Sequence, residues 1–84
     1  MRIIYDEVKR QINLAKHGLD FAALTHDFFL QARIDPAKSG RSVAIGWLGD
    51  VMVIAVIFRP LGAEAISVVS MRPANSKERK RSNG

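Results

Sequence analysis

The chain has 84 residues, a length typical of one domain, and its 48% apolar and 25% charged residues indicate a globular protein. It has no cysteine, which excludes a disulfide framework, a thiolate zinc site and a thiol nucleophile. Its net charge of +5 favours an anionic partner, such as a nucleic acid, an acidic protein or an anionic surface.

The chain carries no pattern that is typical of a membrane segment. The longest apolar run, VMVIAVIF at 51–58, is far too short to cross a bilayer, and no apolar h-region follows the first residues. We therefore expect a cytoplasmic protein that does not contact a membrane.

Two helices are predicted near the N-terminus, after a short edge strand at 2–5. Asp6 is expected to cap a helix over 7–17, and Gly18 follows where a left-handed residue is favoured. Asp20 is expected to cap a second helix, antiparallel to the first. The apolar residues that share a face are Val8, Ile12 and Ala15 in the first helix, and Phe21, Leu24 and Phe28 in the second.

Three further strands are predicted after a loop at 30–40. This loop is expected to turn at Asp35-Pro36, with a short strand at 31–34 as an option. The middle strand is apolar throughout, which is typical of a central strand that is buried on both faces. The strands and turns are, in chain order, 41–48, the turn Gly49-Asp50, 51–58, a turn at 59–62, and 64–71.

The predicted C-terminal segment is strongly basic. Residues 72–84 hold five basic side chains and one acid, Glu78, which gives +4 of the net charge of +5. A short basic helix is expected to begin after Asn75, with 80–84 as a flexible tail. The sequence thus predicts one α+β domain over 1–84, with two N-terminal helices packed on an antiparallel sheet of three or four strands.

Two side chains are candidates for chemistry, and each has a second interpretation. His17 follows Lys16 at the end of the first helix, where it either moves a proton or binds a phosphate, or merely caps the helix. Arg72 directly follows the last strand, where it either clamps a phosphate or forms a surface ion pair. Arg59 is expected at the other end of that strand. Residues 77–81, KERKR, either bind an RNA backbone or an acidic protein, or form a solvated tail.

The sequence predicts neither a metal site nor another cofactor. His17 and His26 lie on different predicted helices, and no carboxylate cluster joins them. Lys, Arg and His alone suffice for RNA cleavage, in which the ribose 2′-hydroxyl attacks the neighbouring phosphate. The enzyme then takes one proton, gives one to the leaving oxygen and stabilises the phosphorane. DNA lacks this nucleophile, so such a site selects RNA.

Three stretches of the sequence form a recognisable pattern when taken in order: YDEVKRQINLAKHGLDFA, RSVAIG and VIFRPLGAEAISVVSMRPANSKER. Together they resemble the BrnT family of toxin–antitoxin toxins. They span nearly the whole chain, from about residue 5 to about residue 80. Ser67 stands where many members of that family carry an arginine.

The resemblance implies a RelE-like endoribonuclease that needs no metal and that inhibits translation and growth. It also implies a co-expressed BrnA-like antitoxin with a ribbon-helix-helix domain, through which alone the complex binds operator DNA. We assign catalysis to Arg72, His17, Lys16 and Arg59, and RNA binding to Lys9, Lys77, Arg79 and Lys80. The alternatives are a non-catalytic basic module that only holds an antitoxin or nucleic acid, and a subunit that only assembles with another protein.

Overall fold

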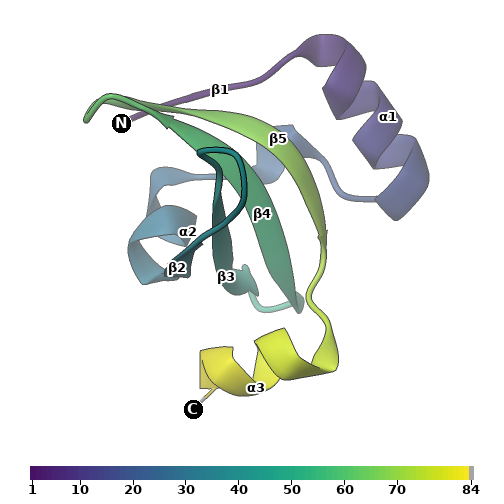
Figure 1. Ribbon diagram of the computed structural model, residues 1–84. Helices are drawn as coiled ribbons and strands as arrows, with labels where there is room; N and C mark the ends of the chain where they lie inside the picture. Colours follow the sequence, from purple (N-terminus) through teal and green to yellow (C-terminus); the bar gives the residue numbers. More distant parts are fainter. Residues whose placement is uncertain (84) are drawn as a thin grey trace.

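A five-stranded mixed sheet with the order β1-β5-β4-β3-β2 forms the centre of the computed structural model, which describes residues 1–83 (Figure 1). β1 is parallel to β5, and the other neighbours are antiparallel. The predicted α+β class is confirmed. The prediction of an antiparallel sheet of three or four strands is wrong, because the sheet has five strands and one parallel pair. The strands are β1 (Arg2–Ile4), β2 (Arg33–Pro36), β3 (Ser42–Leu48), β4 (Met52–Leu61) and β5 (Ala65–Pro73). The helices are α1 (Glu7–His17), the 3₁₀ helix η1 (Phe21–Ala23), α2 (His26–Gln31) and α3 (Ser76–Asn83).

The main core lies between one face of the sheet and the segment that contains η1 and α2. Alternate residues of β3, β4 and β5 point into it, and its largest fully buried side chains are Phe21, Ile54, Met71, Val56 and Val68. A smaller apolar cluster covers part of the opposite face, close to α3, which contacts β3 and β4 (Figure 1). Its members are Ile45, Val53, Ala55 and Ala74. The prediction that β4 is buried on both faces is therefore confirmed.

The prediction of a single second helix is wrong, because the segment after Asp20 forms two short helices, η1 and α2. Asp20 caps η1 by accepting from the Ala22 N–H at 2.9 Å. Leu24 and Thr25 are then extended, and Thr25 caps α2 by accepting from the Phe28 N–H at 3.2 Å. Despite this break between η1 and α2, the residues that a single helix would have buried still face the core. The predicted burial of Phe21, Leu24 and Phe28 is confirmed.

Helix α1 has the predicted bounds but not the expected buried face. Asp6 and Gly18 cap it as predicted. Val8 and Ile12 are 65% and 61% exposed, whereas the polar Asn13 is only 6% exposed. The helix is therefore attached to β5 through the hydrogen-bonded side chain of Asn13, and its apolar stripe stays exposed.

Asn13 attaches α1 to the open edge of β5. β1 pairs with β5 only as far as Ser67, so among residues 1–83 no strand lies beside the backbone beyond that residue on this side. The Met71 N–H donates to Asn13 Oδ1 at 3.1 Å. Asn13 Nδ2 in turn donates to the Leu19 carbonyl oxygen at 3.1 Å. One buried amide therefore fixes α1, the chain that follows it and β5 relative to one another.

Two predicted turns lie elsewhere in the structure. Residues 59–61, expected in a turn, extend β4 as far as the Leu61–Ala65 pair, since the φ of a proline also suits an extended strand. Asp35-Pro36 likewise belongs to β2, which begins two residues later than the optional strand at 31–34. The hairpin between β3 and β4 takes in Val51 as well as the predicted Gly49-Asp50.

Helix α3 confirms the predicted C-terminal helix with Asn75 before its first residue. Residues 80–83, expected in a flexible tail, are helical, and Gly84 lies outside the described residues. Among the helices of residues 1–83, none combines the length and the apolar composition that a bilayer span requires.

Candidate active site

A groove of about 360 Å³ separates α1 from β5. Helix α1 lines it with residues three and four positions apart, which share one face of a helix. Four of the residues assigned from the sequence meet here: Lys9, Lys16, His17 and Arg72. The complete lining is Lys9, Ile12, Asn13, Lys16, His17, Val69, Ser70 and Arg72. None of these residues is acidic, so the groove is suited to an anion.

A β-bulge in β5 sets the wall opposite α1. Ile57 pairs with Ser70 and Phe58 pairs with Val68, so Val69 is an extra residue without a partner on β4. The bulge shifts the alternation of side chains by one residue. Val68 and Met71 consequently both reach the core, and Arg72 lies on the opposite face. No local signal in the sequence marks this bulge, and the roles of Val69 and Ser70 in the groove were therefore not predicted.

Arg72 is held by a two-pronged ion pair with Glu78. Its Nη1 donates to Glu78 Oε1 at 2.7 Å, and its Nη2 donates to Oε2 at 3.0 Å. The hydrogen bonds raise the pKa of Arg72 and lower the pKa of Glu78, against the opposing effect of partial burial. A guanidinium has five N–H donors, so this pair leaves others for an anion in the groove. The ion pair that the sequence left open for Arg72 is present, and it does not preclude phosphate binding.

Glu78 connects Arg72 to the first turn of α3. The Asn75 N–H donates to Glu78 Oε1 at 3.0 Å, and the Glu78 N–H donates to Asn75 Oδ1 at 2.8 Å. This reciprocal pair is a capping box, and the Asn-x-x-Glu spacing indicates it in the sequence. The same carboxylate therefore starts α3 and orients the candidate catalytic arginine.

The remaining basic residues of α3 lie outside the groove. Lys77 and Lys80 are exposed on the helix surface. Arg79 folds back, with Nη1 donating to the Ala74 carbonyl oxygen at 3.1 Å and Nη2 to Ser76 Oγ at 3.3 Å. Its guanidinium thus supports the start of α3, while the two lysines add positive charge to the exposed surface of that helix.

Arg59 does not join the groove. It is exposed and pairs with Ser67, whereas Arg72 pairs with Ala55. The four residue steps from Ala55 to Arg59 along β4 correspond to about 13 Å of extended strand. The sequence correctly predicted that the two arginines lie apart. They do share a face of the sheet, because positions 55 and 59 have the same side-chain direction on β4.

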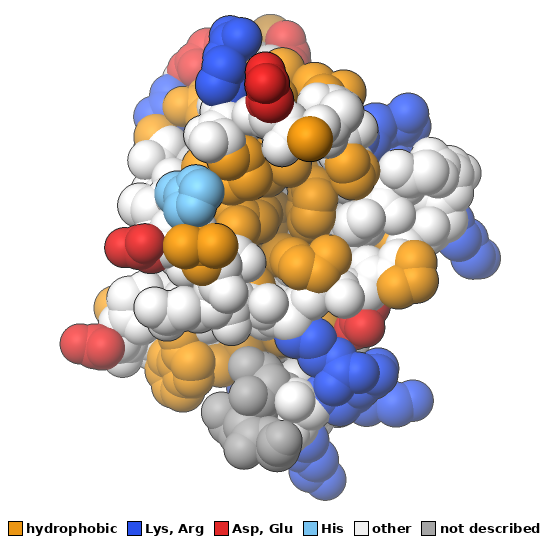
Figure 2. Space-filling model, turned by 90° about the vertical axis from the view of Figure 1, so that its left-hand side faces the viewer, with side chains coloured by type: hydrophobic (Ala, Val, Ile, Leu, Met, Phe, Trp, Pro, Cys, Tyr) orange, Lys and Arg blue, Asp and Glu red, His pale blue; other side chains and the backbone are white. Residues whose placement is uncertain are grey.

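The two histidines have different surroundings. His17 is half-buried at the end of α1, where the helix dipole favours a cation, and it lines the groove. His26 is exposed and borders a separate apolar depression near α2. Figure 2, which faces the side with the N-terminus and α2, shows apolar side chains gathered in the middle of that side. In residues 1–83 no three His, Asp or Glu side chains are placed to hold a metal ion.

Comparisons with known proteins agree with this fold. A family model described as "Ribonuclease toxin, BrnT, of type II toxin-antitoxin system" matches residues 5–78. The crystal structure of the ribonuclease toxin BrnT from Brucella abortus is 56% identical in sequence, with a TM-score of 0.85. That match covers 90% of this chain and 99% of the Brucella chain. No curated protein sequence matches.

The fold and these similarities define a ribonuclease toxin of a type II toxin–antitoxin system. The chain belongs to the BrnT family. The resemblance that the sequence alone provided is thereby confirmed.

Proposed function

We propose that this protein is an endoribonuclease that cleaves RNA in the groove between α1 and β5. The observation that carries the proposal is the convergence of Lys9, Lys16, His17 and Arg72 on one groove whose lining contains no acid. The cleavage proceeds by attack of the ribose 2′-hydroxyl on the adjacent phosphate and needs no metal ion. Loss of RNA then inhibits translation and growth.

Each basic residue has a role in this mechanism. Arg72, oriented by Glu78, stabilises the charge on the phosphorane with N–H donors that the ion pair does not use. His17 or Lys16 takes or gives a proton, since both lie at the C-terminal end of α1 and line the groove. Lys9 binds the RNA backbone there, and Lys77, Arg79 and Lys80 bind it beyond the groove. Arg59 contributes to catalysis from the face of the sheet that it shares with Arg72.

The antitoxin partner implied by the family neutralises this site. We propose a BrnA-like protein with a ribbon-helix-helix domain, which covers the groove and competes with RNA for its positive charge. Operator DNA is then bound through the antitoxin alone. The protein acts in the cytoplasm.

The test is induced expression of the wild type and Arg72→Ala in a bacterium, with growth and total RNA as the readouts. We expect growth arrest and RNA fragmentation in the wild type, and a loss of both in Arg72→Ala. The matched control is Arg33→Ala, which breaks another Arg–carboxylate pair, with Asp35 at 3.2 Å on β2, and lies outside the groove. Equal arrest by the wild type and Arg72→Ala would remove Arg72 from the mechanism.

The second candidate function is a non-catalytic basic module that holds an antitoxin or a nucleic acid. The neutralising pair between Arg72 and Glu78 favours it, because that pair reduces the charge available for catalysis. Incubation of the purified protein with RNA separates the two functions. A binding module shifts the RNA in a gel without shortening it, whereas the proposed enzyme produces fragments.

A further inference from the structure

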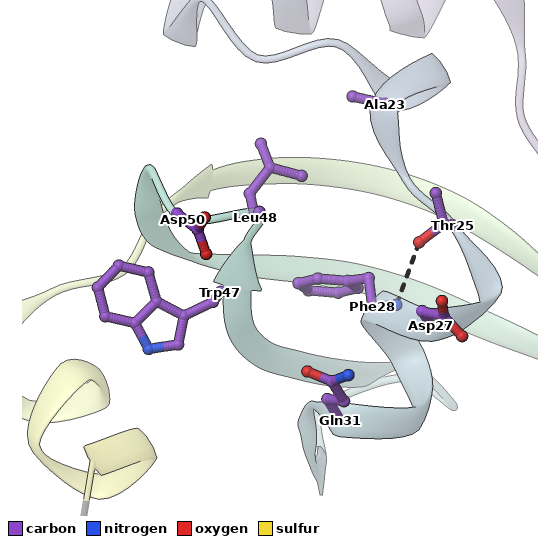
Figure 3. Close-up of a pocket in the computed structure, with 9 residues that line it drawn as sticks. Ala23, Thr25, Asp27, Phe28, Gln31, Trp47, Leu48 and Asp50 are labelled. Atoms are coloured by element: carbon purple, nitrogen blue, oxygen red, sulfur yellow. Dashed lines mark hydrogen bonds between the residues drawn. The ribbon is translucent and has the colours of Figure 1, made fainter.

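A second and larger pocket, of about 440 Å³, lies between α2 and the hairpin that joins β3 to β4 (Figure 3). Trp47 and Asp50 lie on the hairpin side, the α2 side carries Asp27 and Gln31, and the Phe28 ring lies between the two sides. The complete lining is Ala23, Thr25, Asp27, Phe28, Gln31, Trp47, Leu48, Gly49 and Asp50. The catalytic mechanism proposed above uses none of these residues.

Trp47 gives this pocket an exposed aromatic surface. It is the only tryptophan in the chain and is 50% exposed, which is unusual for so large an apolar side chain. Aromatic rings of this kind stack on nucleobases in proteins that bind single-stranded nucleic acid. The phosphates of such a strand need cations nearby. Helix α3 packs against β3 and β4 and carries the exposed Lys77, Lys80 and Arg81.

The polar groups of the pocket suit one kind of base more than another. Asp27 and Asp50 offer carboxylate oxygens, which only accept hydrogen bonds. Gln31 offers both an acceptor and a donor. Carboxylates in this position recognise an exocyclic amino group, as on the N4 atom of cytosine. Uracil has a carbonyl oxygen at the same position, which a carboxylate repels.

The pocket and the catalytic groove are close enough for one strand of RNA. Trp47 pairs with Val53 and Arg72 pairs with Ala55, so the two positions differ by two strands across the sheet and two residues along it. These steps correspond to about 12 Å between backbones. A short single strand that begins in the groove therefore reaches the pocket.

We propose that this pocket binds one nucleobase of the RNA, which stacks on Trp47 and donates its amino group to Asp27 or Asp50. The inference rests on the proposed ribonuclease function and names the feature of the substrate that the protein selects. A base with an exocyclic amino group is bound in preference to uracil.

The test uses 2′-O-methyl hexacytidylate and hexauridylate, which differ in the amino group and cannot be cleaved by 2′-hydroxyl attack. The fluorescence of the single tryptophan reports stacking directly. We expect quenching by hexacytidylate and affinity for it about tenfold higher than for hexauridylate, in line with the usual discrimination by a base-edge contact. In Asp27→Asn/Asp50→Asn, an amide donor replaces each pure acceptor, so this preference should fall to about twofold or less.

Labelled oligonucleotides extend the test to variants without tryptophan. By anisotropy, Trp47→Ala should bind hexacytidylate about tenfold more weakly, since stacking on one aromatic side chain has this magnitude. Trp47→Phe should retain most of the affinity. Val51→Ala is the matched control, because Val51 lies on the same hairpin, is 82% exposed and does not line the pocket.

The result that overturns the base pocket is an absence of quenching together with equal affinity for both hexamers. A Trp47→Ala variant that binds RNA normally but loses affinity for the antitoxin would assign the pocket to a protein interface instead. Arg72→Ala keeps this test independent of the proposed function. In that variant, quenching by hexacytidylate should persist although cleavage of RNA is lost. If the wild type shows quenching but cleaves no RNA, the proposed function is contradicted and the base pocket is not.

Discussion

The pair between Arg72 and Glu78 is the contact at the scale of single residues on which the proposed site depends. Two parallel hydrogen bonds fix the plane of the guanidinium, so that its other donors point in a defined direction. Glu78 is itself held by the capping box with Asn75. A change in the charge of Glu78 therefore affects both the orientation of Arg72 and the start of α3.

This pair predicts a particular response to acid. The bonds from Arg72 lower the pKa of Glu78 below its ordinary value of 4.5. A depressed folded-state pKa means that the stabilisation is complete above about pH 4.5 and is lost as the pH falls through the folded-state pKa. Carbon-13 NMR of the carboxyl groups should show Glu78 titrating below 4.5 in the wild type. In Arg72→Ala its midpoint should move upward.

The control for this titration is Arg33→Ala, which removes a guanidinium that contacts Asp35 and not Glu78. It should leave the midpoint of Glu78 where it is in the wild type. A wild-type midpoint for Glu78 at or above its ordinary value would contradict the ion pair.

Helix α1 is the element that brings the cations to the groove, and its position depends on the side chain of Asn13. Asn13→Ala leaves the Met71 N–H and the Leu19 carbonyl oxygen buried without their partner. We expect a loss of about 2–4 kcal/mol in the free energy of unfolding, because each unsatisfied buried group costs roughly 1–3 kcal/mol. Urea unfolding of the purified variant measures this loss.

Gln11→Ala is the matched control on the same helix. Gln11 is exposed, and within residues 1–83 its side chain bonds only to the exposed Glu7, so its loss should cost less than about 0.5 kcal/mol. Equal stability of Asn13→Ala and the wild type would show that Asn13 does not fix α1 to β5.

At the scale of elements, end signals were more informative than apolar patterns. Asp6 and Gly18 predicted the bounds of α1, and Asn75 predicted the start of α3, because capping is a local interaction. The buried face of α1 was not predictable, because it depends on an amide that bonds to a strand far along the chain. The break at Thr25 and the bulge at Val69 also depend on tertiary packing, which local propensity does not encode.

At the scale of the whole molecule, whose net charge is +5, basic residues from two separate elements meet at one groove. Lys9 and Lys16 lie about two turns apart on one face of α1, and Arg72 faces them from β5. RNA binding should therefore weaken as salt rises, by a slope of about 0.7 in log affinity against log salt for each phosphate contact on a single strand. Lys9→Gln/Lys16→Gln should reduce this slope by about 1.4.

Affinity for a 2′-O-methyl RNA, measured across a series of salt concentrations, checks this prediction. Lys38→Gln is the control, since Lys38 lies in the turn after β2 and does not line the groove. A slope that is the same for the double variant and the wild type would place the phosphate contacts elsewhere.

The site was predictable in part at this scale. The resemblance to the BrnT family assigned Lys9, Lys16, His17 and Arg72, which the fold brings to one groove, and also Arg59, which it does not. The parallel pairing of β1 with β5 was not foreseen, because the two strands lie at opposite ends of the chain and no turn links them. The pocket around Trp47 was also missed, since it forms only where α2 and the hairpin meet.

The position of β5 between β1 and β4 has a consequence for the synthesis of this protein. β5 is the last strand to leave the ribosome, yet β1, α1 and β4 all pack against it. Until residues 65–73 emerge, Asn13 lacks one of its partners, β1 has no neighbour, and the groove has only one wall. A nascent chain therefore carries no assembled site while most of it is being translated, and the proposed activity against RNA begins only when the strand that also carries Arg72 is in place.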